Sequence, residues 1–326
     1  MNKKKIKLGI IGCGEVTKDH YLPIINNKKE WVLTSCCDII KSKAEDISKS
    51  TGAKVFTDYN AMIKESHLDL IILATKEQDH FEILQQIVES GLPIFCEKPL
   101  LARKGQFSID AEDLLLAKKL MYKVKDIKYK LGINFNYRYA IYAKYVKEEI
   151  KNNTLGEIYV INISTSHYCW VHMIDLIIWW FGDFEMVYGF CNRKSRALLG
   201  ISKSKIKVSI NSTKDWPLAH SLFHIQIIGS LSRFEIDDVI GKLVIISGLK
   251  KQIKLYHRND KDRMKILQTT ISESLETFIN EIQLHKQISI NYYDALKQIC
   301  VDAALNESNK LRRPIKIINN NTSFKP

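Results

Sequence analysis

The first 135 residues alternate between short apolar runs rich in β-branched residues and longer amphipathic stretches. This alternation is typical of βαβ units, which assemble into a parallel sheet. One of the stretches, 79–90, carries its apolar residues at helical spacing. Six strands with intervening helices therefore predict an α/β fold with a doubly wound parallel sheet. The strands are expected at 6–11, 32–37, 54–56, 68–74, 93–96 and 130–135.

After residue 135, strand-like runs follow one another without alternating helices. Such clustering predicts a separate α+β domain built on an open, mostly antiparallel sheet. We expect a first domain at 1–125, a second at 126–316 and a polar tail at 317–326, of which 319–326 is expected to fray. In the second domain, strands are expected at 157–164, 185–190, 205–210, 224–228, 242–246 and 252–256, and helices at 142–151, 171–181, 272–285 and 292–310.

Length and charge narrow the class of protein. The 326 residues are enough for about two domains, each with its own hydrophobic core. The formal net charge is +13, but the lysines are spread along the whole chain and no dense basic run carries interleaved aromatic residues. We therefore expect a solvated basic surface and no nucleic-acid partner. A modest preference for anionic ligands is compatible with this charge.

The sequence indicates neither a membrane span nor a metal or disulfide centre. Its most apolar stretch, 173–181, contains Asp175 and is far shorter than the ~20 residues of a transmembrane helix. The basic N-terminus is interrupted by Lys7 before Cys13, so we interpret it as a first strand and not as an export signal. Seven cysteines without C-x-x-C spacing favour reduced thiols, and hence a cytoplasmic location.

A glycine loop lies where the first expected strand turns into a helix. Gly12 and Gly14 permit a tight turn there and let backbone N–H groups approach a pyrophosphate at the helix N-terminus. The third glycine of the G-x-G-x-x-G pattern is replaced by Thr17. Together with Glu15 and Val16, which follow the glycines, the loop predicts a dinucleotide-binding site.

Asp38 closes the second expected strand, 24 residues beyond Gly14. A carboxylate at this position would accept hydrogen bonds from the adenosine ribose hydroxyls and would repel a 2′-phosphate, which favours NAD as the cofactor. NADP is the alternative, because Lys41 and Lys43 follow closely. The other interpretation of Asp38 is an ordinary turn residue at the end of a strand.

Further motifs occur in a fixed order along the chain. They are Asp19 to Pro23, Ala74-Thr75 with His80, Cys96-Glu97-Lys98-Pro99, Asn134 to Arg138, Leu155 to Ile158, His172-x-x-Asp175, Gly229-Ser230, and the segment from Asp294 to Ser308 before Pro314. In this order the motifs resemble the Gfo/Idh/MocA oxidoreductases, the family of glucose-fructose oxidoreductase and inositol dehydrogenase. The resemblance is collinear over residues 5–316.

The resemblance implies a Rossmann domain followed by a domain whose open sheet packs against another subunit, hence a homodimer or homotetramer. It also implies hydride transfer between a nicotinamide cofactor and a sugar, cyclitol or related polyol. By resemblance Lys98 contacts both cofactor and substrate, and His172 accepts the proton of the hydroxyl being oxidised. Thr75, His80 and Glu97 are expected to contribute to the cofactor site, and Arg138, Tyr168 and Asp175 to bind substrate.

The chemistry of these residue types agrees with the roles. Removing a hydroxyl proton calls for a base with a pKa near the working pH, such as the His172 imidazole. An ammonium such as Lys98 can stabilise the developing alkoxide. Each residue also has a plainer interpretation: Lys98 as a solvated lysine, His172 as a structural histidine, Asp175 as a partner of the helix dipole, and Arg138 as the partner of an acidic neighbour.

One region departs from the family pattern. The family commonly carries an aspartate four residues and a glycine two residues before the histidine, where this chain has Tyr168 and Trp170. The expected strand also runs almost directly into His172, so the usual intervening loop is shortened. Tyr168 is a candidate replacement for the aspartate, as a hydrogen-bonding group or a proton relay, and His167 is a further imidazole nearby.

Two functions follow from these observations. The first is an NAD(P)-dependent dehydrogenase or ketoreductase acting on a sugar, nucleotide sugar or cyclitol, with a small-molecule substrate that is free, phosphorylated or nucleotide-linked. The second is a catalytically impaired relative that binds dinucleotide and acts as a sensor or partner subunit. The presence of Lys98 and His172 favours the enzyme, whereas the missing aspartate and the shortened loop favour the binder.

Overall fold

The computed structural model of the chain describes residues 5–124, 130–217, 221–239, 242–247, 252–256, 263–318 and 323–325, with only the backbone described at 242 and 252–256. The chain forms two compact units, each assembled from separate stretches of sequence. The first unit consists of Met1–Gly105, Leu115–Asn134 and Ile271–Ala295, and the second of Gln106–Leu114, Phe135–Thr270 and Leu296–Pro326. A single domain boundary at residue 125 stays a prediction.

The first unit contains a six-stranded parallel sheet, as the alternating pattern predicts. Its strands are β1 (Ile6–Ile11), β2 (Trp31–Cys37), β3 (Lys54–Phe56), β4 (Leu70–Leu73), β5 (Ile94–Cys96) and β6 (Leu131–Ile133), in the order β3-β2-β1-β4-β5-β6. This is the doubly wound order, in which the chain reverses direction across the sheet between β1 and β4. Ligands of such sheets bind at the carboxyl ends of the strands flanking that reversal.

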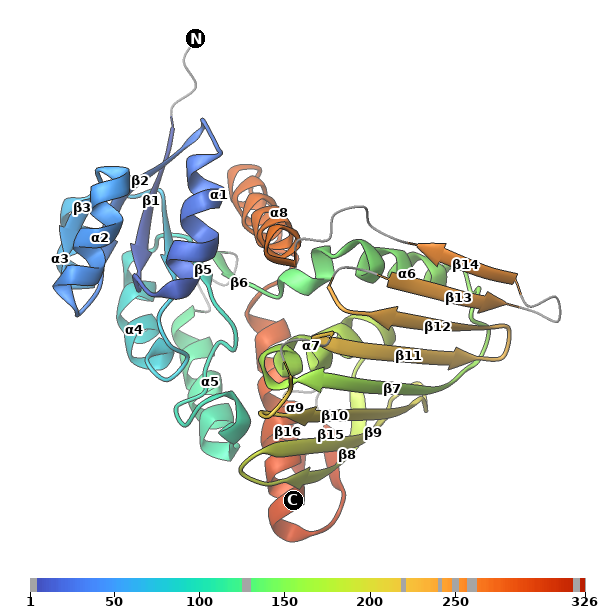
Figure 1. The fold of residues 1–326 in the computed structure, drawn as a ribbon. Helices are drawn as coiled ribbons and strands as arrows, with labels where there is room; N and C mark the ends of the chain where they lie inside the picture. The colour runs from blue at the N-terminus through green and yellow to red at the C-terminus, as the bar shows by residue number, and fades with distance from the viewer. Residues whose placement is uncertain are drawn as a thin grey trace. The chain divides into compact units, whose positions relative to one another are not determined.

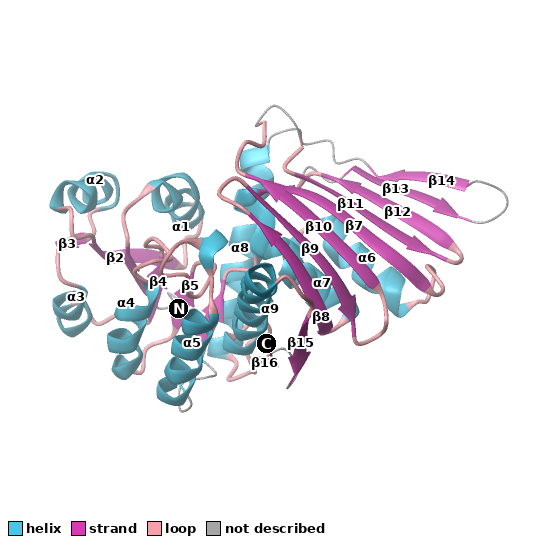
Figure 2. Cartoon of the chain, turned by 90° about the horizontal axis from the view of Figure 1, so that it is seen from below, coloured by secondary structure: helices cyan, strands magenta, loops and turns pink. Residues whose placement is uncertain are grey.

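Helices cover both faces of this sheet. They are η1 (Thr17–Tyr21), α1 (Leu22–Asn26), α2 (Lys41–Thr51), α3 (Tyr59–Glu65), α4 (His80–Ile87) with the short turn η2 (Val88–Ser90), and part of α5 (Ala111–Lys123). Figure 2 shows α1 and α2 on one face and α3, α4 and α5 on the other. The strands are buried on both faces, which explains their nearly continuous apolar sequences.

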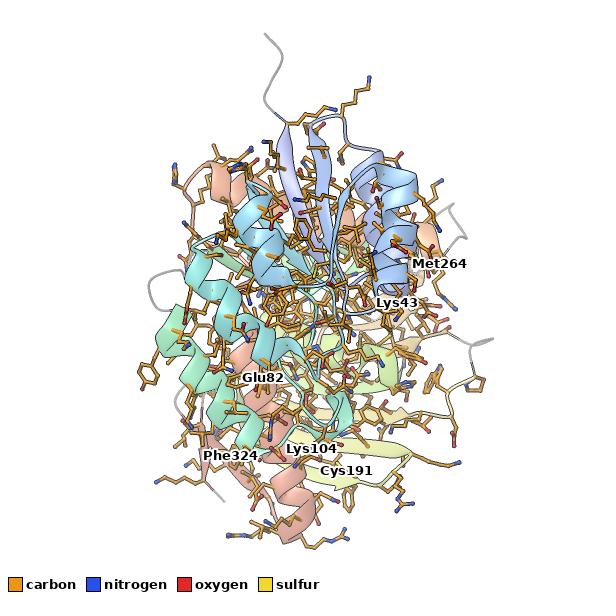
Figure 3. All side chains as sticks on the ribbon, turned by 90° about the vertical axis from the view of Figure 1, so that its left-hand side faces the viewer. Lys43, Glu82, Lys104, Cys191, Met264 and Phe324 are labelled. Atoms are coloured by element: carbon orange, nitrogen blue, oxygen red, sulfur yellow. The ribbon has the colours of Figure 1, made fainter. Side chains whose placement is uncertain are left out.

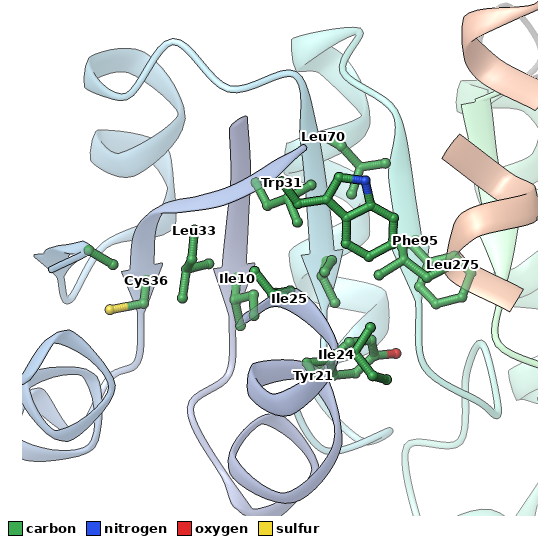
Figure 4. Close-up of a cluster of buried hydrophobic side chains, with 14 of the residues drawn as sticks. Ile10, Tyr21, Ile24, Ile25, Trp31, Leu33, Cys36, Leu70, Phe95 and Leu275 are labelled. Atoms are coloured by element: carbon green, nitrogen blue, oxygen red, sulfur yellow. The ribbon is translucent and has the colours of Figure 1, made fainter. Parts of the chain in front are cut away.

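A hydrophobic cluster lies between the sheet of the first unit and the helices that cover one of its faces (Figure 4). It combines side chains of β1, β2 and β4 with Tyr21 and the α1 residues Ile24 and Ile25. Residues of α8 (Arg263–Gln283), such as Leu275 and Phe278, join the same cluster. This helix was expected at 272–285, and it begins earlier because Ile266 and Ile271 are buried along its first turns.

The second unit is built on a ten-stranded sheet in the order β14-β13-β12-β11-β7-β10-β9-β8-β15-β16 (Figure 1). Among the described strands of this ten-stranded sheet, only β7 and β10 pair in parallel, so the prediction of a mostly antiparallel sheet is confirmed. The strands are β7 (Ile158–Ser166), β8 (Phe184–Cys191), β9 (Ser195–Ser202), β10 (Lys207–Thr213), β11 (Phe223–Gly229), β12 (Ser232–Asp237), β13 (Lys242–Ser247), β14 (Gln252–Tyr256), β15 (Ile315–Ile318) and β16 (Ser323–Lys325).

Helices cover one face of this sheet, which we call the inner face. They are α6 (Ile141–Lys151), α7 (Trp170–Phe181) and the second-unit part of α9 (Tyr292–Leu311), as Figure 2 shows. The inner face is apolar: Phe223 and Phe234 contact aromatic rings of α6, and Gly189 lies close to the backbone of Leu305 in α9. The opposite, outer face carries alternating polar and apolar residues, of which Phe190 and Leu199 are about half exposed.

The C-terminal residues differ from the expected tail. β15 pairs with β8 and β16 with β15, so 317–318 and 323–325 form strands where a polar tail was predicted. The physical reason is that Ile315 and Ile317 are buried and give the segment an alternating apolar face. The remaining residues of that prediction, 319–322 and 326, lie outside the described residues. Among the described helices, none combines the length and apolar character of a membrane span.

Candidate functional site

The glycine loop follows β1 at the carboxyl edge of the first sheet. Gly12 has a φ of +98°, and a Cβ atom there would lie 2.6 Å from the backbone of Ala74 at the end of β4. Only glycine fits this close approach of two strand ends. Around Gly14, in contrast, a Cβ would meet no atom within 4 Å. The loop is therefore tight on its inner side and open on its outer side.

Thr17 occupies the position of the third glycine without disturbing the loop. Its side chain is fully buried, and its hydroxyl donates a hydrogen bond to the Gly12 carbonyl oxygen at 2.6 Å. Glu15 and Val16, between Gly14 and Thr17, are exposed. The first helical turn thus presents its outer surface to solvent while Thr17 holds it against the loop.

Asp38 is bound directly to this loop. Its Oδ2 accepts the backbone N–H of Cys13 at 2.9 Å, and its Oδ1 accepts the N–H of Ile40 at 2.9 Å. The carboxylate that follows β2 is therefore fixed beside the glycines, as the sequence spacing predicts. Lys43, on the neighbouring helix α2, is exposed at the surface of this unit (Figure 3).

The residues of this edge fit a dinucleotide. Open space around Gly14, exposed backbone at the start of a helix and a fixed acceptor at Asp38 are the groups that a pyrophosphate and an adenosine ribose require. The Thr75 hydroxyl, in the loop after β4, is buried and has no hydrogen-bond partner among the described residues. A bound cofactor would supply one.

Glu97 and Lys98 follow β5, the next strand along the sheet. Tyr21 donates its O–H to Glu97 Oε1 at 2.6 Å, and the Asn134 side chain donates to the same oxygen at 2.8 Å. The backbone N–H of Lys98 donates to Glu97 Oε2 at 3.2 Å. The Lys98–Pro99 peptide bond is cis. The main chain at Lys98 is thus hydrogen-bonded to the side chain of its own neighbour.

His80 connects the loops after β4 and β5. Its ring is fully buried, with Nδ1 3.0 Å from the Pro99 carbonyl oxygen and Nε2 3.2 Å from that of Thr75. Burial lowers the pKa of His80, and the two carbonyl contacts oppose this shift. Because both nitrogens face protein carbonyls, the ring connects two loops of the predicted cofactor site, and its own contact with a cofactor stays a prediction.

In the second unit, His172 lies in the first turn of α7 and is buried. The Tyr137 ring stacks on its imidazole, with ring centroids 4.0 Å apart and planes at 9°. Phe135 contacts the imidazole edge to face, with ring centroids 6.4 Å apart. Two aromatic rings from the Asn134–Arg138 motif therefore set the orientation of the His172 ring.

Arg138 and Asp175 bind each other. Arg138 Nε lies 2.9 Å from Asp175 Oδ2 and Nη2 lies 2.5 Å from Oδ1, a bidentate pair with both side chains buried. The guanidinium also lies over the rings of Phe135 and Trp179. Of the two interpretations of Arg138, the acidic neighbour is therefore present in the structure, and substrate binding by either residue stays a prediction.

The shortened segment before α7 forms the single turn η7 (His167–Cys169). Tyr168 is 58% exposed, and its ring lies against that of His167 with centroids 3.7 Å apart. Trp170, at the position of the family glycine, is fully buried and donates its indole N–H to Asp302 Oδ1 at 2.8 Å. A large, buried side chain thus stands where the family commonly has a glycine.

Arg196 completes this arrangement. Its Nη1 lies 3.0 Å from Asp302 Oδ1 and donates to the Gln106 carbonyl oxygen at 3.1 Å, and its guanidinium lies over the rings of Phe107 and Trp170. Both members of the Arg196–Asp302 pair are fully buried. Burial raises the pKa of Asp302, an effect that the charge of Arg196 opposes.

Sequence reasoning missed four contributors to these sites. Tyr21, Asn134 and Tyr137 lie inside motifs of the sequence, but the pattern assigns them no role. Arg196 lies outside these motifs. The signal for the first three was available: buried polar and aromatic residues next to motif residues position them more often than they bind ligand. For Arg196 the sequence carried no such signal.

A cavity of about 510 Å³ lies in the second unit, and of the site residues and contact partners described above only Arg196 lines it. One row of its lining, Ser164, Asn211, Ala197 and Phe190, crosses four neighbouring strands on the outer face of the sheet. None of the predicted site residues lines this cavity. The predicted site residues of the first unit lie at the carboxyl edge of its sheet, and those of the second unit lie in α7, in the turn before it and in the Asn134–Arg138 motif.

Known proteins resemble the chain in sequence and fold. Residues 6–115 match the Gfo/Idh/MocA family, described as an oxidoreductase family with an NAD-binding Rossmann fold. Over 160 residues the chain is 26% identical to inositol 2-dehydrogenase of Rhizobium meliloti (strain 1021), and this match covers 49% of the chain and 45% of that protein. Over 157 residues it is 29% identical to glucose-6-phosphate 3-dehydrogenase of Bacillus subtilis (strain 168), covering 48% and 41%. The chain thus spans about half the length of the curated relatives it matches.

The whole fold has solved counterparts. The WlbA dehydrogenase from Bordetella pertussis, crystallised with NADH and UDP-GlcNAcA, superposes with a TM-score of 0.79 at 17% identity, covering 98% of this chain and 99% of that chain. At that identity the likeness is one of fold. The motif order, the doubly wound sheet with its glycine loop and the family match agree: residues 6–115 match the NAD-binding Rossmann domain of the Gfo/Idh/MocA oxidoreductase family.

Proposed function

We propose that this chain is an NAD(P)-dependent oxidoreductase that transfers a hydride between a nicotinamide cofactor and a hydroxyl-bearing or keto carbon of a sugar, nucleotide sugar or cyclitol. The observation that carries the proposal is the glycine loop, open around Gly14 and fixed to the Asp38 carboxylate. The relatives named above are dehydrogenases of inositol and of glucose 6-phosphate, which supports a sugar-like substrate.

The cofactor is held by the first unit in this proposal. Gly12 makes the tight turn, and its N–H donates to the Cys37 carbonyl oxygen at 2.9 Å. The backbone N–H groups at Gly14, Glu15 and Val16 bind the pyrophosphate, and Asp38 binds the adenosine ribose. Because a fixed carboxylate repels a 2′-phosphate, NAD is preferred over NADP. Thr75, His80, Glu97 and Lys98 surround the nicotinamide end. When bound, the nicotinamide ring accepts or supplies the hydride.

Lys98 and His172 are the catalytic residues in this proposal. The Lys98 ammonium stabilises negative charge on the substrate oxygen as its proton leaves. The His172 imidazole accepts that proton during oxidation and returns it during reduction. Tyr137, stacked on the imidazole, holds the ring in one plane so that the accepting nitrogen keeps its direction.

The substrate contacts are assigned to Tyr168, Arg138 and Asp175. The exposed ring and hydroxyl of Tyr168 suit a sugar face or a sugar hydroxyl. Arg138 and Asp175 are buried and bind each other, so their assignment to the substrate site rests on the family resemblance alone. The basic net charge is favourable for a phosphorylated or nucleotide-linked substrate.

We further propose a cytoplasmic homodimer or homotetramer that associates through the outer face of the ten-stranded sheet. This face carries the half-exposed side chains Phe190 and Leu199, and such apolar area is commonly covered in an assembly. Size-exclusion chromatography with light scattering tests the assembly, and a monomer at micromolar concentration would contradict it. Leu199→Asp is expected to weaken an assembly made through this face.

The function is tested by titrating the protein with NADH and NADPH by fluorescence and then adding a panel of sugars, sugar phosphates, cyclitols and nucleotide sugars. We expect the protein to bind NADH and to oxidise or reduce at least one compound of the panel. Turnover is measured by the absorbance of the reduced cofactor. Lys98→Ala and His172→Ala are expected to fold and lose turnover. Lys64→Ala and His224→Ala, exposed residues of the same types, serve as matched controls.

The outcomes separate the two functions. Binding without turnover on the whole panel would favour the impaired, dinucleotide-binding relative. Loss of binding to both cofactors would contradict the assignment of the glycine loop. Full turnover by Lys98→Ala or His172→Ala would overturn the role of that residue.

A further inference from the structure

The carboxylate of Glu97 connects two buried side chains to the main chain of Lys98. Tyr21 is the last residue of η1, in the helical segment after the glycine loop, and Asn134 follows β6, the edge strand next to β5. Both donate to Oε1, at 2.6 and 2.8 Å, while Oε2 accepts the Lys98 N–H at 3.2 Å. The two oxygens of one carboxylate thus have separate partners.

We propose that Tyr21 and Asn134 are positioning residues for Lys98 and act on it through Glu97. The inference rests on the proposed function, in which Lys98 is catalytic. It goes beyond that function by assigning a positioning role to two residues that bind the neighbouring Glu97 carboxylate.

Both donors are fixed by the core of the first unit. The Tyr21 ring is fully buried and meets Phe95 edge to face, with centroids 6.5 Å apart, and Phe95 packs in turn on Phe278 (Figure 4). Asn134 is 2% exposed, and its backbone N–H donates to the Cys96 carbonyl oxygen at 2.9 Å. The position of Glu97 Oε1 is therefore set by well-packed groups and not by a flexible surface side chain.

Burial also keeps the donors in one state. Burial, reinforced by the charge of Glu97, raises the pKa of Tyr21 well above its ordinary value, so the hydroxyl stays protonated and continues to donate. Because Tyr21 and Asn134 are buried, water does not compete with them as a hydrogen-bond donor to Glu97 Oε1 on the side where they lie. Hydrogen bonds to an ionised acceptor are stronger than those between neutral groups. The Glu97 carboxylate consequently has one preferred plane.

The residue after Lys98 is held as well. The Pro99 carbonyl oxygen lies 3.0 Å from His80 Nδ1, in a fully buried ring. Lys98 therefore lies between two residues that buried side chains contact, Glu97 and Pro99. Correct placement of a reacting group is worth orders of magnitude in rate, so loosening Glu97 is expected to lower turnover more than binding.

Amide hydrogen exchange at Lys98 tests the positioning without any need for turnover. The full chain is labelled with ¹⁵N-lysine, and exchange of the Lys98 amide is followed by NMR in the wild type, Tyr21→Phe and Tyr142→Phe. Tyr21→Phe removes only the hydroxyl and keeps the packed ring. Tyr142→Phe removes a buried hydroxyl that has no partner among the described residues, which makes it the matched control.

Exchange at Lys98 is expected to be at least about tenfold faster in Tyr21→Phe and unchanged in Tyr142→Phe, because only the first loosens the acceptor Glu97. Asn134→Ala provides a second variant with the same expected direction. If Lys98 exchanges at the wild-type rate in both Tyr21→Phe and Asn134→Ala, the proposal is wrong.

Kinetics then test whether the effect passes through Glu97. On the substrate found in the panel, Tyr21→Phe is expected to lower kcat by about tenfold, with KM and NADH affinity within about twofold. In a Glu97→Gln background the same change is expected to add little, since coupled residues are not additive. Additive losses would contradict the proposal. A wild type without turnover would overturn the proposed function alone, because the exchange experiment decides the positioning.

Discussion

Arg138 holds Asp175 with both N–H groups of one guanidinium edge, Nε 2.9 Å from Oδ2 and Nη2 2.5 Å from Oδ1, in a place where both side chains are buried. The pair joins the turn after β6 to the helix that carries His172, which lies one helical turn before Asp175. The ion pair is therefore expected to stabilise the second unit and to hold the helix that carries His172.

Breaking this pair is expected to cost much more than breaking an exposed one. Asp175→Ala leaves a buried guanidinium without its counter-charge and should lower the free energy of unfolding by about 3–5 kcal/mol. Asp215→Ala, which removes the partner of exposed Lys194, should change it by less than about 1 kcal/mol. Urea unfolding measures both. Equal losses would mean that Arg138 and Asp175 do not depend on each other.

Asp38 is expected to determine the choice between NADH and NADPH. Asp38→Asn keeps an oxygen to accept from the Cys13 N–H but removes the negative charge that repels a 2′-phosphate. The ratio of the two dissociation constants should move toward NADPH by about tenfold. Fluorescence titration gives the ratio, and Asp58→Asn, at the N-terminus of α3, is the matched control. A proportional loss for both cofactors would remove this role from Asp38.

His80 predicts an acid-dependent loss of stability. Burial lowers its pKa in the folded state below the ordinary value of 6.5, although the Pro99 and Thr75 carbonyls and the charges of Glu97 and Glu77 act in the opposite direction. The folded chain therefore binds a proton at His80 less readily than the unfolded chain. This contribution to stability is complete above pH 6.5 and is lost as the pH falls from 6.5 to the folded pKa.

Urea unfolding of the wild type and His80→Gln between pH 7.5 and pH 5 isolates this contribution. Each unit of pKa depression corresponds to about 1.4 kcal/mol, so the stability gap between the two proteins should narrow on acidification. His285→Gln, an exposed histidine, is the control. A gap that stays constant with pH would show that His80 does not titrate in this range.

The Tyr137 ring is expected to support turnover by stacking on the His172 imidazole and holding its orientation. Tyr137→Leu removes the stack on His172, an interaction worth about 0.5–1.5 kcal/mol, and should lower kcat by up to about tenfold. Tyr137→Phe keeps the stack and loses only the hydroxyl contact with Cys169 Sγ, so its kcat should stay near that of the wild type. Steady-state kinetics with a pH profile distinguish the variants, and equal losses in both would refute a role for stacking.

The parts of the fold that could be predicted have strong local signals. All six strands of the first sheet were found because they are short, apolar and β-branched, and β1, β3 and β14 have the expected bounds. β9 (Ser195–Ser202) and β12 (Ser232–Asp237) were missed, because their charged and small residues weaken the apolar pattern. Both strands take their place from neighbours on either side, an influence that a local pattern does not contain.

The same limit applies to the candidate site. The spacing within one βαβ unit predicts Asp38 as a ribose acceptor at the end of the second strand, but the hydrogen bond that Asp38 accepts from the Cys13 N–H was not predicted. The contacts of Glu97 with Tyr21 and Asn134 cross 76 and 37 residues of sequence, and they arise only when β5, β6 and the glycine-loop helix are packed together. The buried pair of Arg196 and Asp302 depends on two distant elements in the same way.

Thr17 bears on how chains of this kind are recognised. Its hydroxyl bond to the Gly12 carbonyl oxygen closes the turn with a side chain at the position where the familiar pattern has none. A motif search that requires glycine at the third position would reject this loop, although the Thr17 hydroxyl bond closes the turn. A threonine or serine at that position is therefore compatible with a closed glycine loop. Thr17→Gly removes the hydroxyl bond to Gly12 and is expected to loosen the loop.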